Sequence, residues 1–212
     1  MPPSRADARP ARTAPSSIAT VAVFCGAQMG NDPVYRQAAR DLGHGLARAG
    51  IRLVYGGGHV GLMGTVADAV LDGGGQVTGV IPEFLTRREV AHDRVIDLVV
   101  TDSMHSRKQR MFQLSDAFVM MPGGLGTLDE IVEIITWRQL GLHDKPILLC
   151  NIRDGAGAGS AAPLSATIEA AIATGFAQAS VRALFEVAEG AQAVLDRLAS
   201  LSKGAAGESA RL

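Results

Sequence analysis

The sequence predicts an α/β fold in which a mainly parallel sheet is flanked by helices. The first observation is that short apolar, β-branched runs alternate along the chain with segments of helical length, as in stacked βαβ units. The second is composition, because 47% of the residues are hydrophobic and 19% are charged, which suits a packed core. The third is length, since 212 residues suffice for one well-buried domain and are too few for two typical ones.

The predicted elements follow one another in a regular order. The predicted strands are residues 19–24, 52–55, 76–81, 95–100, 117–121 and 146–150. The predicted helices are residues 34–49, 61–72, 103–114, 128–140, 164–174 and 191–201. This order resembles a doubly wound, Rossmann-like domain, in which ligands bind at the carboxyl ends of the strands.

We expect this single domain to span residues 18–202. Residues 1–17 are rich in Pro, Ala and Arg and lack the apolar middle of a secretory signal, so we predict a disordered tail. Residues 203–212 are predicted to be a flexible C-terminal tail. The Gly- and Ala-rich segment 153–162 is predicted to be a flexible loop.

Composition argues against several classes of partner. The formal net charge is -1, and basic residues form only small clusters such as Arg107-Lys108 with Arg110, which suit one phosphate or carboxylate. Aromatic residues make up 4% of the chain, too few for a stacking platform for single-stranded nucleic acid. No apolar stretch reaches the ~18 residues of a membrane span. The sequence therefore indicates a small anionic ligand, with no nucleic acid and no membrane.

The cysteines and histidines show no metal-binding pattern. Cys25 and Cys150 each follow an apolar run, and two isolated thiols are typical of a protein in a reducing compartment. The histidines have neither HExxH nor clustered-ligand spacing. We therefore expect a cytoplasmic protein without a metal site.

The first glycine cluster, Gly56-Gly57-Gly58 with Gly61, lies between a predicted strand and a predicted helix and fits G-x-G-x-x-G. Such glycines let backbone N–H groups approach a phosphate, so Gly57 and Gly58 are candidate phosphate-loop residues. A tight turn that needs positive φ is the alternative. The acidic residue that a dinucleotide site needs after the next strand is not evident. Its lack weakens the hypothesis that the protein is an NAD-dependent oxidoreductase.

A second glycine cluster, PGGLGT at residues 122–127, also runs from a predicted strand into a predicted helix. Two such loops in one sheet suggest a bipartite anion site. Neither loop continues as Gly-Lys-Ser/Thr, which argues against a triphosphate-cleaving P-loop. Thr127 and Glu130 have the spacing of a capping box, but a carboxylate one turn from a phosphate cradle can instead face the sugar of a ligand. One rotamer of Glu130 cannot fully serve both roles.

The helix 103–114 places Arg107 among apolar residues. Met104, Met111 and Leu114 share a helical stripe with Arg107, and this stripe is expected to be buried. A guanidinium there keeps its charge and needs an anionic partner, unless it snorkels at the edge of the stripe. Lys108 and Arg110 are expected beside it, towards solvent.

Together these motifs resemble the Lonely Guy (LOG) family of cytokinin riboside 5′-monophosphate phosphoribohydrolases over residues 19–151. The matching motifs are Tyr55-Gly56-Gly57-Gly58 with Gly61-Leu62-Met63-Gly64, Gly79-Val80-Ile81-Pro82, Met104-His105 with Arg107-Lys108 and Met111, Asp116-Ala117-Phe118, PGGLGT ending in Glu130, and Thr136-Trp137 with Gln139-Leu140-Gly141.

The resemblance implies a Rossmann-like homodimer that hydrolyses the N-glycosidic bond of a nucleoside 5′-monophosphate, with AMP as a further expected substrate. Arg107 and Glu130 are the implied catalytic pair. The implied substrate contacts are Glu89, Arg107, Lys108, Gly123, Gly124, Leu125, Gly126, Thr127 and Thr136. A helix with apolar residues on more than one face (Ile131, Val132, Ile134, Ile135 and Trp137) is either fully buried or shared with a partner, and the resemblance favours the homodimer.

Two positions depart from the family pattern. Asp129 stands where the family usually has Glu, and residues 152–162 carry Gly and Ala in place of an aromatic segment. Family members have often been labelled lysine decarboxylases. The three lysines, Lys108, Lys145 and Lys203, lie in no cofactor-binding pattern, so no cofactor is expected. A nucleotide- or cofactor-binding carrier without turnover is the alternative function, and the Arg107/Glu130 pair favours the enzyme.

Overall fold

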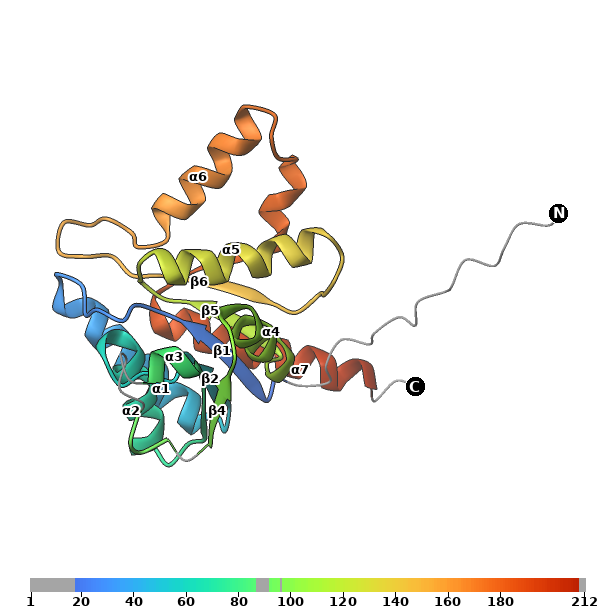
Figure 1. Cartoon of the computed structure of the whole chain (residues 1–212). Helices are drawn as coiled ribbons and strands as arrows, with labels where there is room; N and C mark the ends of the chain where they lie inside the picture. Colours follow the sequence, from blue (N-terminus) through green and yellow to red (C-terminus); the bar gives the residue numbers. More distant parts are fainter. Residues whose placement is uncertain (1–17, 87–91, 96, 210–212) are drawn as a thin grey trace.

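The described residues form one seven-stranded parallel sheet. The computed structural model describes residues 18–86, 92–95 and 97–209. Its strand order is β4-β3-β2-β1-β5-β6-β7, and Figure 1 labels β4, β2, β1, β5 and β6. The strands are β1 (Thr20–Phe24), β2 (Arg52–Tyr55), β3 (Val77–Pro82), β4 (Asp97–Thr101), β5 (Ala117–Met120), β6 (Ile147–Asn151) and β7 (Glu186–Glu189). Every pairing is parallel, so the predicted Rossmann-like α/β fold is confirmed.

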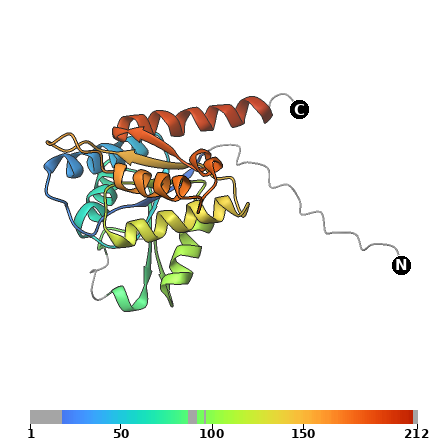
Figure 2. The same ribbon diagram turned by 90° about the horizontal axis from the view of Figure 1, so that it is seen from above.

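Helices cover both faces of the sheet. Helices α1 (Pro33–Arg48), α2 (Gly61–Asp72) and α7 (Gly190–Ser209) contribute to one core cluster. The other cluster is built by α4 (Met104–Leu114) and α5 (Leu125–Gln139), with α6 (Ala162–Ala173) beside them. Figure 2 shows α7 and α5 on opposite sides of the sheet. The short α3 (Glu83–Thr86) and the 3-10 helix η1 (Ala179–Leu184) complete the described elements.

Side chains alternate between these two cores along the central strand. Val21 and Val23 of β1 point into the first cluster, whereas Ala22 and Phe24 point into the second. This is the two-residue period of an extended chain in a sheet that is buried on both faces. It explains why the strands read as continuous apolar runs in the sequence. No helix in the described part of the chain has the length and apolarity needed to cross a bilayer.

Several elements differ from the predicted ones. Helix α5 begins at Leu125 rather than at residue 128, and α7 continues to Ser209, through most of the segment 203–212 that was expected to be flexible. The edge strand β7 was not predicted, because its sequence EVAE is largely exposed and lacks an apolar run. The predicted N-terminal tail, residues 1–17, lies outside the described residues.

The segment 153–162, predicted to be a flexible loop, contains a hydrogen-bonded turn. The Asp154 carboxylate accepts from the backbone N–H groups of Ala156 and Ala158, at 3.0 and 2.9 Å. The N–H of Gly155 donates to Asp32 Oδ2 at 2.7 Å and ties the turn to the start of α1. Asp is well suited to such local backbone bonds, which the Gly and Ala content of the segment concealed.

The strand order opens a crevice beside β1. From β1 the chain builds β2, β3 and β4 towards one edge, and β5, β6 and β7 lie on the other side. The connections that leave β1 and β5 therefore diverge at the carboxyl ends of these neighbouring strands. In open α/β sheets this switch point is the usual place for a ligand.

Candidate active site

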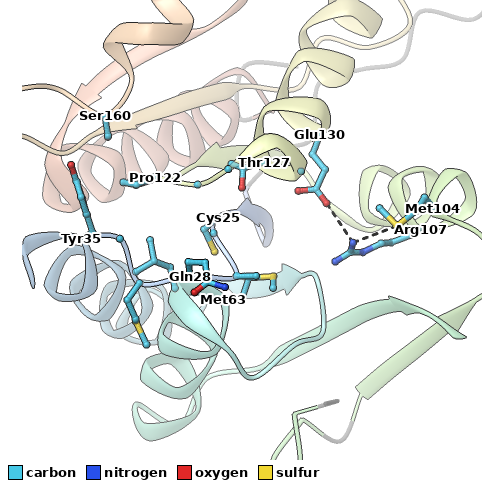
Figure 3. A pocket seen from close by; sticks show the side chains of 18 residues that line it. Cys25, Gln28, Tyr35, Met63, Met104, Arg107, Pro122, Thr127, Glu130 and Ser160 are labelled. Carbon is cyan, nitrogen blue, oxygen red and sulfur yellow. Dashed lines mark hydrogen bonds and ion pairs between the residues drawn. The ribbon is translucent and has the colours of Figure 1, made fainter. Parts of the chain in front are cut away.

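A cavity of about 630 Å³ lies at this switch point (Figure 3). Its volume falls in the range of small-molecule sites. Most of its wall comes from the connection after β1 (residues 25–30) and from the loop after β5 with the first turns of α5. The remaining described lining residues are Tyr35, Leu62, Met63, Met104, Arg107 and Ser160. The cavity therefore brings together segments that are far apart in the sequence.

The N-terminus of α5 offers unsatisfied backbone donors to this cavity. The N-cap residue, Gly124, has no side chain with which to cap the helix, and Gly123, Gly124 and Gly126 line the cavity. Within the described residues, the N–H groups of Leu125, Gly126 and Thr127 have no hydrogen-bond acceptor. The N–H groups and the helix dipole make such an end an anion-binding site.

The neighbouring helix ends do not offer the same donors. The Asp32 side chain caps α1 by accepting from the N–H of Val34 at 2.9 Å. At α2, the N–H groups of Leu62 and Met63 both donate to the carbonyl oxygen of Gly26, at 3.0 and 3.2 Å. Of these three helix ends, the N-terminus of α5 is therefore the candidate for binding an anion.

Gly26 joins the three connections that build the cavity floor. Its N–H donates to the carbonyl oxygen of Pro122 at 3.0 Å, while its carbonyl oxygen receives the two donors of α2. Gly61, with φ +63°, makes this approach feasible, because a Cβ there would overlap the backbone of Ala27.

Arg107 is buried and fixed by the backbone of the sheet. Its Nε donates to the carbonyl oxygen of Val80 at 3.0 Å, and its Nη2 to that of Gly56 at 2.9 Å. Only 5% of the residue is exposed. The predicted buried stripe is thus present around Arg107 and Met111, and the snorkelling alternative was wrong. Two of the three guanidinium nitrogens serve as anchors, and Nη1 is directed towards Glu130 (Figure 3).

Glu130, on α5, faces Arg107, which lies on α4. Its Oε1 lies 3.8 Å from Arg107 Nη1, which is an ion pair but longer than a hydrogen bond. The predicted capping box is absent, because α5 begins one turn earlier than expected. Thr127 is therefore a residue of the first turn, and Glu130 lies in the second turn, where it does not cap the helix.

The thiol of Cys25 lies in the same wall and stays neutral. Burial, together with the negative charge of Glu130, raises the pKa of Cys25 far above its ordinary value. A thiol with a raised pKa is a poor nucleophile at neutral pH. Arg107, Glu130 and the N-terminus of α5 remain the candidate groups for chemistry in this cavity.

The other predicted site residues are distributed over several places. Gly123, Gly124, Gly126 and Thr127 line the cavity, and a Cβ at position 123 would overlap the Thr127 side chain. Leu125 is 86% exposed and is not among the described lining residues. Lys108 lies outside the described lining and pairs with Asp129 and Glu133, with only 15% of its side chain exposed. It therefore does not project into solvent as predicted, whereas Arg110 is exposed.

Thr136 is not among the described residues that line this cavity. The Thr136 hydroxyl donates to the carbonyl oxygen of Val132, and the residue borders a separate cavity of about 160 Å³ between α5 and α6. Glu89 lies outside the described residues.

Gly57 and Gly58 are not among the described residues that line the main cavity. Gly57 has φ +82°, and a Cβ on it would come within 3.0 Å of Ile81 Cβ. This geometry favours the tight-turn alternative for the first glycine cluster. The structure instead places in the cavity wall the connection after β1 (residues 25–30), Tyr35 and Ser160, which we did not predict. A signal for the first of these was present, since Cys25-Gly26 ends the strand that the topology places at the centre.

The fold and the cavity define a Rossmann-like α/β protein with a small-molecule site at its topological switch point. A family model described as "Possible lysine decarboxylase" matches residues 63–198. The chain is 46% identical over 173 residues to the cytokinin riboside 5′-monophosphate phosphoribohydrolase of Rhodococcoides fascians, covering 81% of this chain and 83% of that protein. It is 42% identical over 183 residues to one from Arabidopsis thaliana, covering 86% and 84%. The chain therefore belongs to the cytokinin riboside 5′-monophosphate phosphoribohydrolase family.

Solved structures of other proteins share this fold. The molybdenum cofactor binding protein from Rippkaea orientalis aligns with a TM-score of 0.64 at 22% identity, over 86% of this chain and 96% of that one. The molybdenum cofactor carrier protein from Chlamydomonas reinhardtii aligns with a TM-score of 0.62 at 20% identity, with the same coverage. At this level of identity the likeness establishes the fold alone.

The described lysines do not fit the decarboxylase description. Pyridoxal chemistry uses a lysine amine in the active site. Lys108 is held by two carboxylates, and Lys145 is buried elsewhere, with Nζ 2.7 Å from the carbonyl oxygen of Phe112. Neither is among the described residues that line the cavity.

In the described part of the chain, no group of three or more His, Cys, Asp or Glu residues has metal-binding geometry.

Proposed function

We propose that this protein hydrolyses the N-glycosidic bond of cytokinin riboside 5′-monophosphates, and of AMP, to release the free base and ribose 5-phosphate. Family membership supports the reaction class, because the relatives from R. fascians and A. thaliana carry this activity in their names. The observation that carries the proposal is that one helix, α5, presents both an uncapped N-terminus and the Glu130 carboxylate to the same cavity.

The spacing along α5 suits a nucleoside 5′-monophosphate. Glu130 follows the N-cap Gly124 by six residues, which is roughly 9 Å of helix at 1.5 Å per residue. A phosphate at the N–H groups of Gly126 and Thr127 would leave the ribose beside the second turn. In that position Glu130 would face the anomeric carbon, C1′. The phosphate would thus orient the sugar, which is a large part of what a bound substrate needs.

In the proposed reaction, water forms a bond to C1′ while the bond from C1′ to the base nitrogen breaks. The electron pair of that bond goes to the base, and one proton of the water ends on the base. The transition state resembles an oxocarbenium ion, so the Glu130 carboxylate would stabilise its positive charge or accept the proton of the attacking water. Arg107 is unsuited to act as an acid, because a guanidinium keeps its proton in proteins. It would hold Glu130 in place.

The apolar part of the wall supports a purine with or without an isoprenoid group. Met29, Leu62, Met63 and Met104 all line the cavity. Methionine side chains adapt to irregular ligands, which agrees with a base that varies in its substituent.

The proposal is tested by incubating the purified protein with AMP, with isopentenyladenosine monophosphate and with the unphosphorylated ribosides. We expect free base and ribose 5-phosphate from the monophosphates and very little base from the ribosides. Equal rates with and without the phosphate would refute the role of α5. Tight binding of AMP without any release of base would contradict the proposed reaction and favour the alternative function, a nucleotide carrier without turnover.

We further propose a symmetric homodimer that forms through the outer face of α5. Ile131, Ile134 and Ile135 are buried, whereas Leu128 and Val132 remain exposed at 37% and 45%. A helix with apolar residues on a second face is a candidate for a shared interface. Light scattering at micromolar concentration tests this, and a monomer would contradict it. The buried free thiols Cys25 and Cys150 support a cytoplasmic location.

A further inference from the structure

Lys108 joins the two helices that carry the proposed catalytic pair. Its Nζ lies 3.0 Å from Asp129 Oδ2 and 3.1 Å from Glu133 Oε2. Lys108 directly follows Arg107 on α4, and Asp129 directly precedes Glu130 on α5. Arg107 and Glu130 themselves touch only through the 3.8 Å ion pair. The closest charged link between α4 and α5 at this level is therefore the one that Lys108 makes.

Lys108 is the first residue of a seam that continues along both helices. Lys108 and Phe112 are one turn apart on α4, and Asp129, Glu133 and Trp137 follow at four-residue steps on α5. Residues at such spacing share one helix face. Phe112 and Trp137 meet edge to face, with ring centroids 5.1 Å apart. We call these five residues the α4–α5 seam.

The seam depends electrostatically on Lys108. Asp129 and Glu133 are like charges at i and i+4, an arrangement that destabilises a helix unless a cation lies between them. Burial lowers the pKa of Lys108, but its bonds to Asp129 and Glu133 outweigh this and raise the pKa above the ordinary value. Removing the cation would leave two like charges one turn apart on α5, next to Glu130, and would remove the charged contacts that hold α5 against α4.

We propose that Lys108 is a positioning residue, which holds α5 against α4 through Asp129 and Glu133 and so sets the distance between Glu130 and Arg107. This inference rests on the proposed function. It differs from the role of a substrate contact that the family resemblance implies for Lys108. It also assigns a role to Asp129, the residue that departs from the family pattern, because Asp129 supplies one of the two carboxylates.

The test combines turnover of AMP with the fluorescence of Trp137, the single tryptophan of the chain. In Lys108→Met we expect kcat to fall on the order of 10- to 100-fold, because a small misplacement of catalytic groups has that effect. KM for AMP should stay unchanged, and the Trp137 emission should shift. The double variant Lys108→Glu/Asp129→Lys restores a cation between two carboxylates and should recover both kcat and emission. Arg197→Met is the matched control, because it breaks the exposed pair with Glu186 and should change neither.

A raised KM with unchanged kcat and unchanged emission in Lys108→Met would overturn the inference and make Lys108 a substrate contact. Failure of the charge-swapped variant to recover emission would overturn it as well. If the wild-type protein releases no base, the proposed function fails separately. The seam is then decided by fluorescence alone, and an unchanged Trp137 emission in Lys108→Met would refute it.

Discussion

The guanidinium of Arg107 lies directly against Gly56, in the position that a Cβ on residue 56 would take. A Cβ at position 56 would overlap Arg107 Nη2, and the carbonyl oxygen of the same glycine accepts a hydrogen bond from that nitrogen. The glycine is therefore required by the close approach of an arginine. The first glycine cluster thus serves the cavity indirectly, by giving Arg107 room.

Replacing Gly56 by Ala should displace the Arg107 side chain, because a Cβ there would overlap Nη2, and should lower the thermal midpoint, because the guanidinium loses its hydrogen bonds to the backbone. We expect a loss of turnover on the order of 100-fold, as for other misplaced catalytic groups. The double variant Gly56→Ala/Arg107→Ala should be no less active than Arg107→Ala alone, since both changes remove the same interaction. Additive losses of kcat would contradict this explanation.

Gly126→Ala should separate stability from binding. Nothing lies within 4 Å of a Cβ at this position, and the residue is in the first turn of α5. Alanine should stabilise the helix by up to ~1 kcal/mol and raise the thermal midpoint. If the 5′-phosphate binds here, the added methyl group should raise KM for AMP, while inhibition by adenosine changes much less. An unchanged KM for AMP would place the phosphate elsewhere.

Glu130→Gln should give a folded protein that binds AMP and scarcely turns it over. Gln keeps the shape of the side chain but removes the charge that pairs with buried Arg107, so the thermal midpoint should fall while the fold is retained. Losing the charge that faces the developing cation should lower kcat on the order of 100-fold or more. Calorimetric binding and turnover in one preparation measure both effects. Near-native kcat would remove Glu130 from the mechanism.

The buried thiols should make the protein sensitive to alkaline pH. Burial, aided by the charge of Glu189, raises the pKa of Cys150 from 9.0 to about 12. Above pH 9 the unfolded chain releases this proton and the folded chain retains it, so stability falls as the pH rises towards 12. The loss is at most ~1.4 kcal/mol per pH unit for one group. Thermal midpoints between pH 7 and pH 10.5 should fall more steeply for the wild type than for Cys150→Ala, and parallel curves would contradict this account.

The buried parts of the fold were predictable because burial leaves a mark in the sequence. Strands such as β1 and β5 are covered on both faces, so each reads as an unbroken apolar run. Strand β7 has no such apolar run, because it is an exposed edge strand held by its pairing with β6. The start of α5 was missed because Gly124 and Gly126 have low helix propensity, although the helix end is well placed to bind an anion.

The candidate site was predictable where a residue conflicts with its surroundings. Arg107 stood out as a charge on an apolar stripe, and it is buried beside Glu130. The connection after β1 carried no such conflict, because its role comes from the central place of β1 in the strand order. Lys108 looked like a solvent-facing residue because its two carboxylate partners are 21 and 25 positions further along the chain.

The hydrogen bonds of Gly26 also limit how this cavity can be re-engineered. The N–H and the carbonyl oxygen of this one residue hold the connection after β1 against both Pro122 and the start of α2. A change of sequence at positions 27–30, made to admit a different base, will therefore be transmitted to the loop at the start of α5. Altered selectivity should be sought at side chains that project from rigid helices, such as Met63 and Met104, where the wall can change shape while its framework stays fixed.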